Sequence, residues 1–323
     1  MTQAFPPLPR ATDSEGNARL TGVEIEFSGL DADRVAEIAC QTLGGRAKQV
    51  DSHAWTVAET EIGTLDIYLD TALRHAENSA LKRIGLDIGK EVIPVEIVTK
   101  PLDLDGLAAL DRLRAALRDA GAAGTRAGLA YGFGVHLNPG IASADASGIT
   151  APLLAYALIE SWMREAHPID FSRRILPFTD PYPTRLVEAL CHAGIVDPGA
   201  MAEIYLTHAP SRNYGLDMLP ILAWMDEDLV RRMLGAGGSV SARPAFHFRL
   251  PDCRIDEADW SLHHEWLRWR LVEQLAEDRD LLGRMMAEWQ EMHGSVVLRR
   301  APWAERCGAL MEDAGLIEER SVT

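Results

Sequence analysis

The stretch that decides the fold is GVEIEF, at residues 22–27, because its side chains alternate strictly between apolar and acidic. Successive side chains of a β-strand point to opposite faces, so the valine, isoleucine and phenylalanine share one face. Glu24 and Glu26 share the other face, about 7 Å apart along the strand. The pattern predicts a strand with an apolar side against a core and two carboxylates on its polar side.

Three later stretches, residues 93–99, 132–138 and 245–250, show the same alternation and are expected to be strands. If the four strands share one sheet, its polar face gathers carboxylates, imidazoles, an amide and a guanidinium. Oxygen ligands suit Mg²⁺ or Mn²⁺, and an arginine complements the charge of a transferring phosphoryl group. The same alternation is also typical of the solvent-facing side of an antiparallel sheet. The residues on the polar face are Glu24, Glu26, Glu96, His136, Asn138, His247 and Arg249.

Strands are concentrated early in the chain and helices late, which favours an α+β fold over alternating βαβ units. We expect residues 1–20 to form a flexible arm apart from the core, and residues 21–323 to form a single domain with a helical insertion at about 150–232. LGAGGSVS, at residues 234–241, is a candidate mobile loop. Further strands are expected at residues 21–28, 46–50, 53–59 and 65–70, and helices at 31–43, 105–119 and 259–292.

Composition excludes several classes of protein. The chain has 323 residues, 47% hydrophobic and 25% charged, and a formal net charge of −16. So acidic a chain is a poor general ligand for nucleic acid or for an anionic membrane surface. Its four widely spaced cysteines and the lack of a secretory signal favour a reduced, cytoplasmic protein. The tryptophans of residues 260–269 have the spacing of helix packing.

Five segments in order resemble the putative amidoligase enzyme family, a branch of the carboxylate–amine ligase superfamily that includes glutamine synthetase and γ-glutamylcysteine ligase. They spread over most of the chain. An ExE strand alone is a weak motif, whereas the five together are considerably more specific. The segments are GVEIEF (22–27), EIVTKPL (96–102), YGFGVHLNP (131–139), RNYGLDMLP (212–220) and RPAFHFRLPD (243–252).

The resemblance implies a curved, mainly antiparallel sheet with helices on its outer face, whose inner face binds divalent cations with ATP. Glu24, Glu26 and Glu96 would be metal ligands. His136, with Asn138 beside it, resembles the histidine of the metal- or nucleotide-binding strand. Arg249, as a catalytic residue, would contact the transferred phosphate.

Two positions depart from the superfamily pattern. His247 stands where glutamine synthetases have a glutamate, so a nucleotide or substrate contact is as plausible for it as a metal ligand. Lys100 stands where a smaller or apolar residue is expected, and it either touches phosphate or lies at the rim. Arg212 and Arg243 are candidates for contacts to substrate carboxylate or phosphate, and surface salt bridges are at least as probable for each.

The implied reaction is ligation of a carboxylate to an amine. ATP phosphorylates the carboxylate, and the amine then displaces phosphate from the acyl phosphate. The expected partners are a small-molecule or peptide carboxylate and an amine, and the superfamily often forms homo-oligomers. Three carboxylates are candidates for the base that deprotonates the amine: Glu96, Asp217 and Asp252.

Other functions remain open on the sequence alone. A metal-dependent hydrolase or a kinase would use the same polar face. A non-catalytic binding module would keep the ligase fold without turnover. The presence of both carboxylates of the ExE strand makes the ligase the preferred hypothesis.

Overall fold

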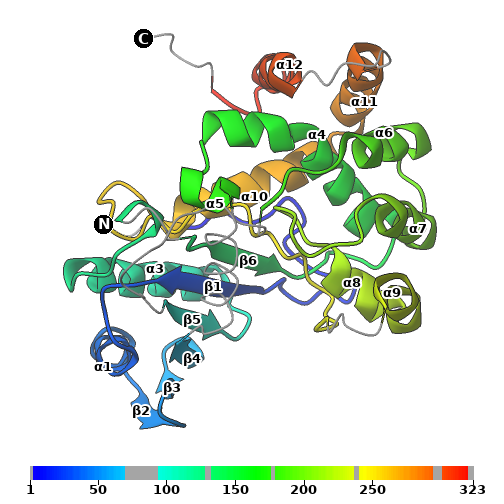
Figure 1. Ribbon diagram of the computed structural model, residues 1–323. Coiled ribbons are helices and arrows are strands. Elements are labelled where there is room, and N and C mark those ends of the chain that lie inside the picture. The colour runs from blue at the N-terminus through cyan, green and yellow to red at the C-terminus, as the bar shows by residue number, and fades with distance from the viewer. Residues whose placement is uncertain are drawn as a thin grey trace.

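The structure is a computed structural model that describes residues 3–69, 94–127, 132–175, 179–235, 240–293 and 300–318. Over these residues it is an α+β protein with a six-stranded antiparallel sheet (Figure 1). The strands are β1 (Thr21–Phe27), β2 (Arg46–Gln49), β3 (Ala54–Thr60), β4 (Gly63–Leu69), β5 (Val95–Thr99) and β6 (Val135–Pro139). The helices are α1 (Ala32–Leu43), α3 (Leu104–Asp119), η1 (Thr125–Ala127), η2 (Ala146–Thr150), α4 (Ala151–Ala166), α5 (Phe171–Ile175), α6 (Thr184–Ala193), α7 (Pro198–His208), α8 (Leu219–Met225), α9 (Glu227–Leu234), α10 (Leu262–Glu277), α11 (Arg279–His293) and α12 (Arg300–Asp313).

Most of the elements expected from the sequence are confirmed, with ends that shift by a few residues. The six strands expected from residues 21 to 138 are β1–β6, and the two early helices are α1 and α3. The succession of helices expected after Pro152 corresponds to α4–α9. Asp70, Ile93 and Tyr131 lie outside the described residues, as does the centre of the candidate mobile loop at 234–241.

The strand order is β2-β3-β4-β5-β1-β6, so the ExE strand β1 lies between β5 and β6. The antiparallel register places Glu26 opposite Glu96 of β5. It also places Glu24 opposite His136 of β6. Because residues opposite each other in a ladder point to the same face, the register alone brings these four side chains onto one side of the sheet.

The other side of the sheet is apolar. Helix α1 contacts β3 and β4 and packs against α3, whose Leu110 and Leu113 are fully buried. The sheet side chains in the core are β-branched or large, as expected for a buried pleated surface. They include Val23, Ile25, Phe27, Val57, Leu65, Ile67, Val95 and Ile97.

The prediction of a regular strand at 245–250 is wrong. This segment pairs with β6 only through isolated bridges, at Ala245 and Phe248, and its register shifts by one residue before the next bridge at Asp252. One cause is Pro139, which accepts a hydrogen bond from the amide of Phe246 but has no N–H to return. The segment nevertheless runs along the edge of β6, so its side chains reach the same region as a seventh strand would.

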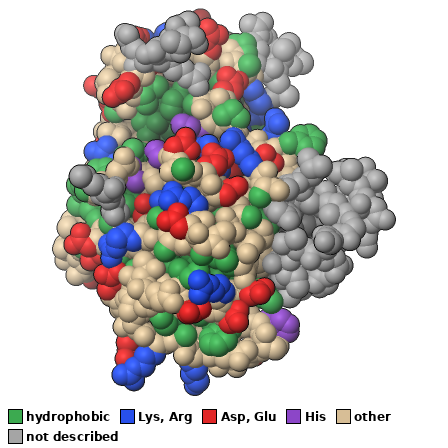
Figure 2. All heavy atoms as spheres, turned by 90° about the vertical axis from the view of Figure 1, so that its left-hand side faces the viewer, with side chains coloured by type: hydrophobic (Ala, Val, Ile, Leu, Met, Phe, Trp, Pro, Cys, Tyr) green, Lys and Arg blue, Asp and Glu red, His purple; other side chains and the backbone are tan. Residues whose placement is uncertain are grey.

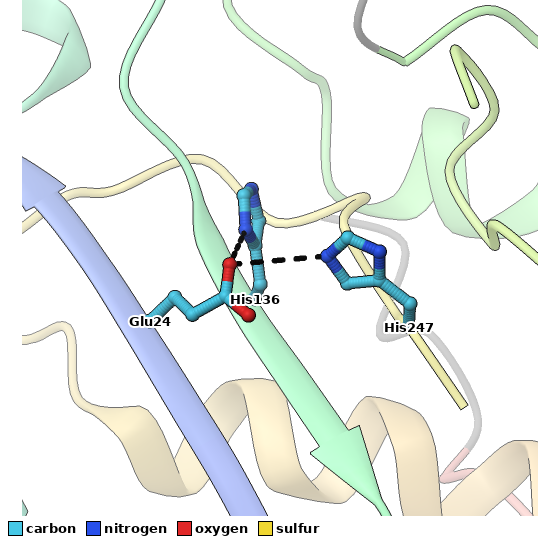
Figure 3. Close-up of side chains that lie close together, drawn as sticks. All are labelled: Glu24, His136 and His247. Atoms are coloured by element: carbon cyan, nitrogen blue, oxygen red, sulfur yellow. Dashed lines mark hydrogen bonds and ion pairs between the residues drawn. The ribbon is translucent and has the colours of Figure 1, made fainter. Parts of the chain in front are cut away.

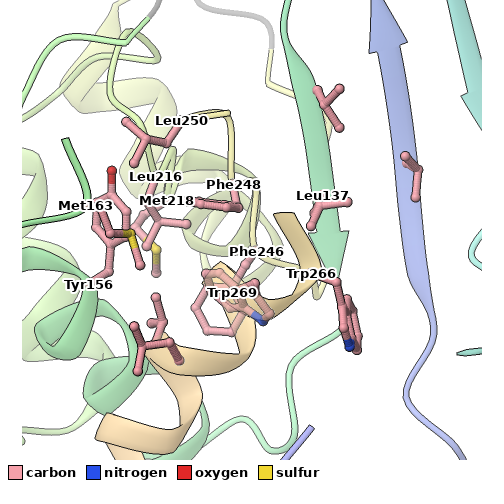
Figure 4. Packing of buried hydrophobic residues seen from close by; sticks show 14 of the residues in the cluster. Leu137, Tyr156, Met163, Leu216, Met218, Phe246, Phe248, Leu250, Trp266 and Trp269 are labelled. Atoms are coloured by element: carbon pink, nitrogen blue, oxygen red, sulfur yellow. The ribbon is translucent and has the colours of Figure 1, made fainter. Parts of the chain in front are cut away.

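Helices α4 and α10 pack against each other on the side of β6 away from β2 (Figure 1). Trp269 of α10 lies under Phe246 and Phe248, with ring centroids 4.8 and 5.7 Å apart (Figure 4). Trp260 and Trp266 are also buried, which confirms that these tryptophans pack in the core.

The single long helix expected at 259–292 is wrong, because the chain forms two helices there, α10 and α11. The break lies at Asp278, which ends α10 and whose side chain accepts a hydrogen bond from the amide of Leu281. Aspartate favours such a cap over a helix interior, because its short side chain satisfies amides that the helix leaves free.

The segment before β1 lies against the core, not apart from it as expected. Phe5 and Leu8 are buried. The indole of Trp266 donates to the carbonyl of Pro6, and Arg19 pairs with Glu273 of α10. Proline-rich polar sequence carries no periodic signal, so this docking could not be read from the local pattern.

The four cysteines are free thiols, and Cys191, Cys253 and Cys307 are buried. Within the described part of the chain, no helix combines the length and apolar character needed to cross a bilayer. On the face shown in Figure 2, acidic and basic side chains are interspersed and form no large field of one sign.

Candidate functional site

Glu24 is the centre of the polar cluster on β1. Its Oε2 lies 2.7 Å from Nδ1 of His136, and its Oε1 accepts a hydrogen bond of 2.9 Å from the side-chain amide of Asn138. Nε2 of His247 faces the same Oε2 at 3.9 Å. Figure 3 shows these two imidazoles converging on the carboxylate from β6 and from the segment beside it.

His247 is oriented from behind by Asp217. The Asp217 side chain is fully buried, and its Oδ2 lies 3.3 Å from Nδ1 of His247. The other oxygen of Asp217 accepts from the amide of Leu219, and Arg212 contacts Oδ2 at 3.1 Å. The Nδ1–H of His247 therefore donates to Asp217, which leaves the lone pair of Nε2 directed at Glu24.

The pKa values of this group follow from burial and charge. Burial lowers the pKa of His247 to about 4, against the opposing hydrogen bond and charge of Asp217. Burial by itself raises the pKa of Glu24, but the hydrogen bond and charge of His136, with the charges of His247 and Arg243, bring it far below 4.5. Burial likewise acts to raise the pKa of Asp217, which the hydrogen bond and charge of His247 lower overall. At neutral pH the carboxylates are ionised and His247 is neutral, the protonation states that bind a metal.

Glu26 and Glu96 form a second pair of carboxylates beside this group. Both are buried, with 6% and 7% exposure, and they stand directly opposite each other in the β1–β5 ladder. Oε2 of Glu26 accepts a hydrogen bond of 2.7 Å from the amide of Gly134, and its Oε1 lies 3.8 Å from Nε2 of His136. Two carboxyl groups that face each other across a ladder offer oxygen ligands of the kind that bind a divalent cation.

Gly134 has a steric reason to be glycine. A Cβ at this position would lie 2.7 Å from Nη2 of Arg173 and 3.1 Å from Nε2 of His136. Arg173 is 1% exposed and donates to the carbonyls of Arg249, Leu250 and Pro251. It thereby fixes the segment that carries His247 and Arg249. Sequence reasoning missed Arg173, because FSRRI at 171–175 has no motif or alternation that marks it.

Of the other basic residues predicted for the site, Arg243 contacts Glu24, Arg249 interacts with its neighbours by charge, and Lys100 lies apart. Arg243 donates to Oδ1 of Asn138 and lies 3.6 Å from Oε1 of Glu24. Nη1 of Arg249 donates to the carbonyl of Arg212, and its charge interacts with those of Asp217 and Glu26. Lys100 is exposed and pairs with Asp66 at 3.7 Å, so the structure does not bring it to the cluster.

Two of the three candidate bases lie behind the site. Asp217 is engaged by His247 and Arg212, as described above. Asp252 accepts hydrogen bonds from the amide of Asp170 and from Arg173. Glu96, on the polar face of β5, is the candidate base that shares a face with the cluster.

A cleft of about 830 Å³ opens beside Glu24. It is lined by residues of β1, β5 and β6, the segments after β5 and β6, a loop of residues 13–20, Trp224 and residues 243–245. Its volume lies in the range of small-molecule sites. The cluster therefore borders a space large enough for a substrate.

Glu24, His136 and His247 meet the geometric requirement of a metal site, because one potential ligand atom of each lies within 4.8 Å of the others. Two of these three candidate ligands, Glu24 and His136, were expected from the sequence, which left a metal role for His247 open. Nε2 of His247 is buried and, among the described residues, has no hydrogen-bond partner. A lone pair facing a carboxylate oxygen without a proton between them is satisfied by a cation.

Comparison with known proteins gives the family. Searches of curated proteins and of solved structures found no match to this chain. Comparison with models of protein families matches residues 17–271 to the family described as "Putative amidoligase enzyme". The match contains β1, β6 and the segment that carries His247 and Arg249, and it covers well over half of the chain. The chain therefore belongs to the putative amidoligase enzyme family.

Proposed function

We propose that this protein is an ATP-dependent carboxylate–amine ligase that forms an amide or isopeptide bond through an acyl phosphate. The observation that carries the proposal is the convergence of Glu24, His136 and His247 beside the carboxylates of Glu26 and Glu96. Membership of an amidoligase family supports amide-bond formation as the reaction. ATP, as the source of the driving force, follows from that reaction class.

The donor set fits a divalent cation. The Nε2 atoms of His136 and His247 face carboxylate oxygens of Glu26 and Glu24 at 3.8 and 3.9 Å. These imidazoles suit Mn²⁺ better than Mg²⁺, whereas the carboxylates of Glu26 and Glu96 suit either ion. A divalent cation held there would offset the charge of the ATP phosphates.

The residues of the site then divide the chemistry. An oxygen of the substrate carboxylate attacks the γ-phosphorus, and ADP leaves as the P–O bond breaks. The ammonium first loses one proton, the amine nitrogen then forms the C–N bond as the bond to phosphate breaks, and a second proton leaves to give the amide. We assign Arg249 to the transferring phosphoryl oxygens, because an arginine complements charge spread over several oxygens. We assign proton removal to Glu96, since Asp217 and Asp252 are engaged behind the site.

The test measures ADP release by purified protein with ATP, Mn²⁺ or Mg²⁺, and panels of carboxylates and amines. We expect ADP formation that requires both an acid and an amine, with an amide product found by mass spectrometry. Glu26→Gln should lose activity by at least about a hundredfold, because it removes a charged carboxylate that would hold the cation offsetting the charge of the ATP phosphates. Glu203→Gln, an exposed carboxylate on α7, is the matched control and should keep full activity.

A metal-dependent hydrolase is the second candidate, because two histidines and one carboxylate are also the ligand set of catalytic zinc sites. Bond cleavage that needs metal but no ATP would establish it and overturn the ligase. Phosphate transfer to a substrate without amide formation would mean a kinase. Calorimetry that finds no binding of metal–ATP would revive the non-catalytic binding module.

A further inference from the structure

The cleft beside Glu24 runs along the β1–β6 pair in one direction only. From the pair Glu24 and His136 it passes Gly22 and Asn138, then Leu20 and Gly140. Four strand residues span about 13 Å, so the cleft extends well beyond the metal ligands. Glu26 and Glu96 lie on the opposite side of Glu24 and do not line it.

Gly22 forms the floor of the cleft, and the fold itself does not require a glycine there. It shares the polar face of β1 with Glu24, and both line the cleft. A Cβ at Gly22 would meet Asn138 at 3.5 and 3.6 Å, which is ordinary van der Waals contact. Glycine inside a strand weakens it and often marks the close approach of a ligand. The missing side chain therefore keeps the floor open.

The walls of the cleft are apolar and partly exposed. Leu20 is 41% and Trp224 is 43% exposed, and both line the cleft with Ile141 and Pro244. Large apolar side chains left open to solvent beside a polar site are typical of a ligand-binding surface. An aromatic wall also attracts a cation or an aliphatic chain.

The outer end of the cleft is acidic. Asp13 and Glu15 lie in the loop of residues 13–17, which is closed by the bridge between Thr12 and Ala18 and lines the cleft beyond Arg19 and Leu20. The two arginines that line the cleft are both engaged. Arg19 is paired with Glu273 through both terminal nitrogens, and Arg243 bonds Asn138. A ligand that extends from the cluster to the rim therefore meets apolar walls and then negative charge.

We propose that this cleft binds the acceptor substrate, and that the acceptor is an aliphatic primary amine carrying a second cationic group. One amine reaches the reacting carbon near Glu24, the chain lies over Gly22 against Trp224, and the second cation lies near Glu15. The assignment of this ligand as acceptor rests on the ligase function proposed above. The binding site itself rests on the cleft.

The experiment compares 1,8-diaminooctane, 1,10-diaminodecane and spermidine, which are long enough to extend from Glu24 toward the outer end of the cleft, with butylamine, which lacks the second cation. Binding is measured by titration calorimetry, and KM for amine and for ATP by ADP release. We expect the diamines to bind about tenfold more tightly than butylamine. Gly22→Val should weaken diamine binding and raise KM for the amine by at least about tenfold, since the three carbon atoms of the isopropyl group fill the floor. KM for ATP should change less than twofold.

The variants separate a binding role from a structural one. Gly22→Val should unfold at the same or a higher temperature than the wild type, because a β-branched residue replaces a glycine in a strand. Trp224→Ala should weaken diamine binding about tenfold, and Glu15→Gln should weaken it about threefold while leaving butylamine unchanged. Met233→Ala, an exposed apolar side chain on α9, and Glu203→Gln are the controls and should change nothing.

The outcomes distinguish the two proposals. If the protein binds diamines, Gly22→Val abolishes that binding, and no amine-dependent ADP release is found, the proposed binding site stands and the proposed ligase function is wrong. Ligation in which Gly22→Val and Trp224→Ala raise KM for ATP instead would keep the function and assign the cleft to the nucleotide. If butylamine and the diamines bind equally tightly and Glu15→Gln changes neither, the proposal that the acceptor carries a second cationic group is wrong.

Discussion

His247 lies between two carboxylates, with Asp217 at Nδ1 and Glu24 at Nε2. Its ring is 3% exposed, and burial lowers its pKa to about 4. A neutral imidazole whose proton is held on the far nitrogen is the state that a metal site needs. The same state makes His247 a source of acid sensitivity when no metal is bound.

We expect the metal-free protein to lose stability as pH falls from 6.5 to about 4 because of His247. In this window the unfolded chain binds a proton at this residue and the folded chain does not, so the free energy of unfolding falls with pH. A shift of this size amounts to about 3 kcal/mol in all. Urea unfolding in EDTA at pH 7 and pH 5 measures the part of this loss that falls above pH 5, about 2 kcal/mol, which His247→Gln should largely remove.

Comparison of the wild type with His247→Gln separates the effect of His247 from that of other titrating groups. The pKa values of Glu24 and Asp217 are lowered from 4.5 and 3.8, so their contributions are lost only at more acidic pH. Burial also lowers the pKa of His263, but His263 acts equally in both proteins. An unchanged pH slope in His247→Gln would show that another group carries the acid sensitivity.

Strict alternation in the sequence made part of the candidate site predictable. Glu24 and Glu26 follow from period two within one strand, and His136 from the same pattern in β6. Local alternation cannot supply the register, which decides that Glu24 meets His136 and Glu26 meets Glu96. It also cannot reveal Arg173, whose role depends on contacts with a segment 76 to 79 residues away.

At the scale of elements, α4 is a largely buried helix, and Asp145 caps η2, the short helix that leads into it. The carboxylate accepts hydrogen bonds from the amides of Ser147 and Gly148 and from the hydroxyls of Ser143 and Ser147. It starts η2, which continues directly into α4. One exposed side chain thus satisfies several groups that a helix end leaves free.

Asp145→Ala should lower the free energy of unfolding by about 1 kcal/mol at pH 7, the usual cost of losing a cap. Asp145→Asn should cost only a few tenths, because asparagine caps equally well. Hydrogen bonds, chiefly from Ser147, lower the pKa of Asp145 from 3.8 to about 2. The advantage of the aspartate is therefore fully present above pH 3.8 and is lost as pH falls toward 2.

Urea unfolding of the wild type and both Asp145 variants at pH 7 and pH 3 provides the measurement. The difference in unfolding free energy between the wild type and Asp145→Asn should shrink toward the lower pH, since only the aspartate titrates. An Asp145→Ala protein as stable as the wild type would show that η2 begins without this cap.

Element boundaries were predictable where the pattern was periodic and failed where single residues broke it. Val23, Ile25 and Phe27 fix β1 by alternation. At 245–250 the alternation is equally clear, but Pro139 across from it cannot donate, so a continuous ladder does not form. At Asp278 the apolar pattern continues, and the break arises from a cap, which no hydrophobic period reports.

At the scale of the whole molecule, Arg19 ties the N-terminal segment to both the sheet and α10. Its terminal nitrogens bond both oxygens of Glu273 at 2.7 and 2.6 Å. Its Nε donates to the carbonyl of Gly140, just beyond β6, and Nη1 donates to the carbonyl of Arg10. The pair is 3% and 7% exposed, so water does not replace these contacts.

Arg19→Met should therefore cost about 3–5 kcal/mol of unfolding free energy, because it leaves the charge of Glu273 buried without its partner. The double variant Arg19→Met with Glu273→Gln should recover most of that loss, since it removes the unpaired charge while the side-chain oxygen still accepts from the indole of Trp269. Arg34→Met, which removes an exposed pair with Glu37, is the control and should cost less than about 1 kcal/mol. Urea unfolding of the four proteins decides the matter. A loss at Arg19 no larger than at Arg34 would mean that the N-terminal segment is held by its other contacts, such as the burial of Phe5 and Leu8 and the hydrogen bond from Trp266 to Pro6, and the recovery in the double variant would then vanish as well.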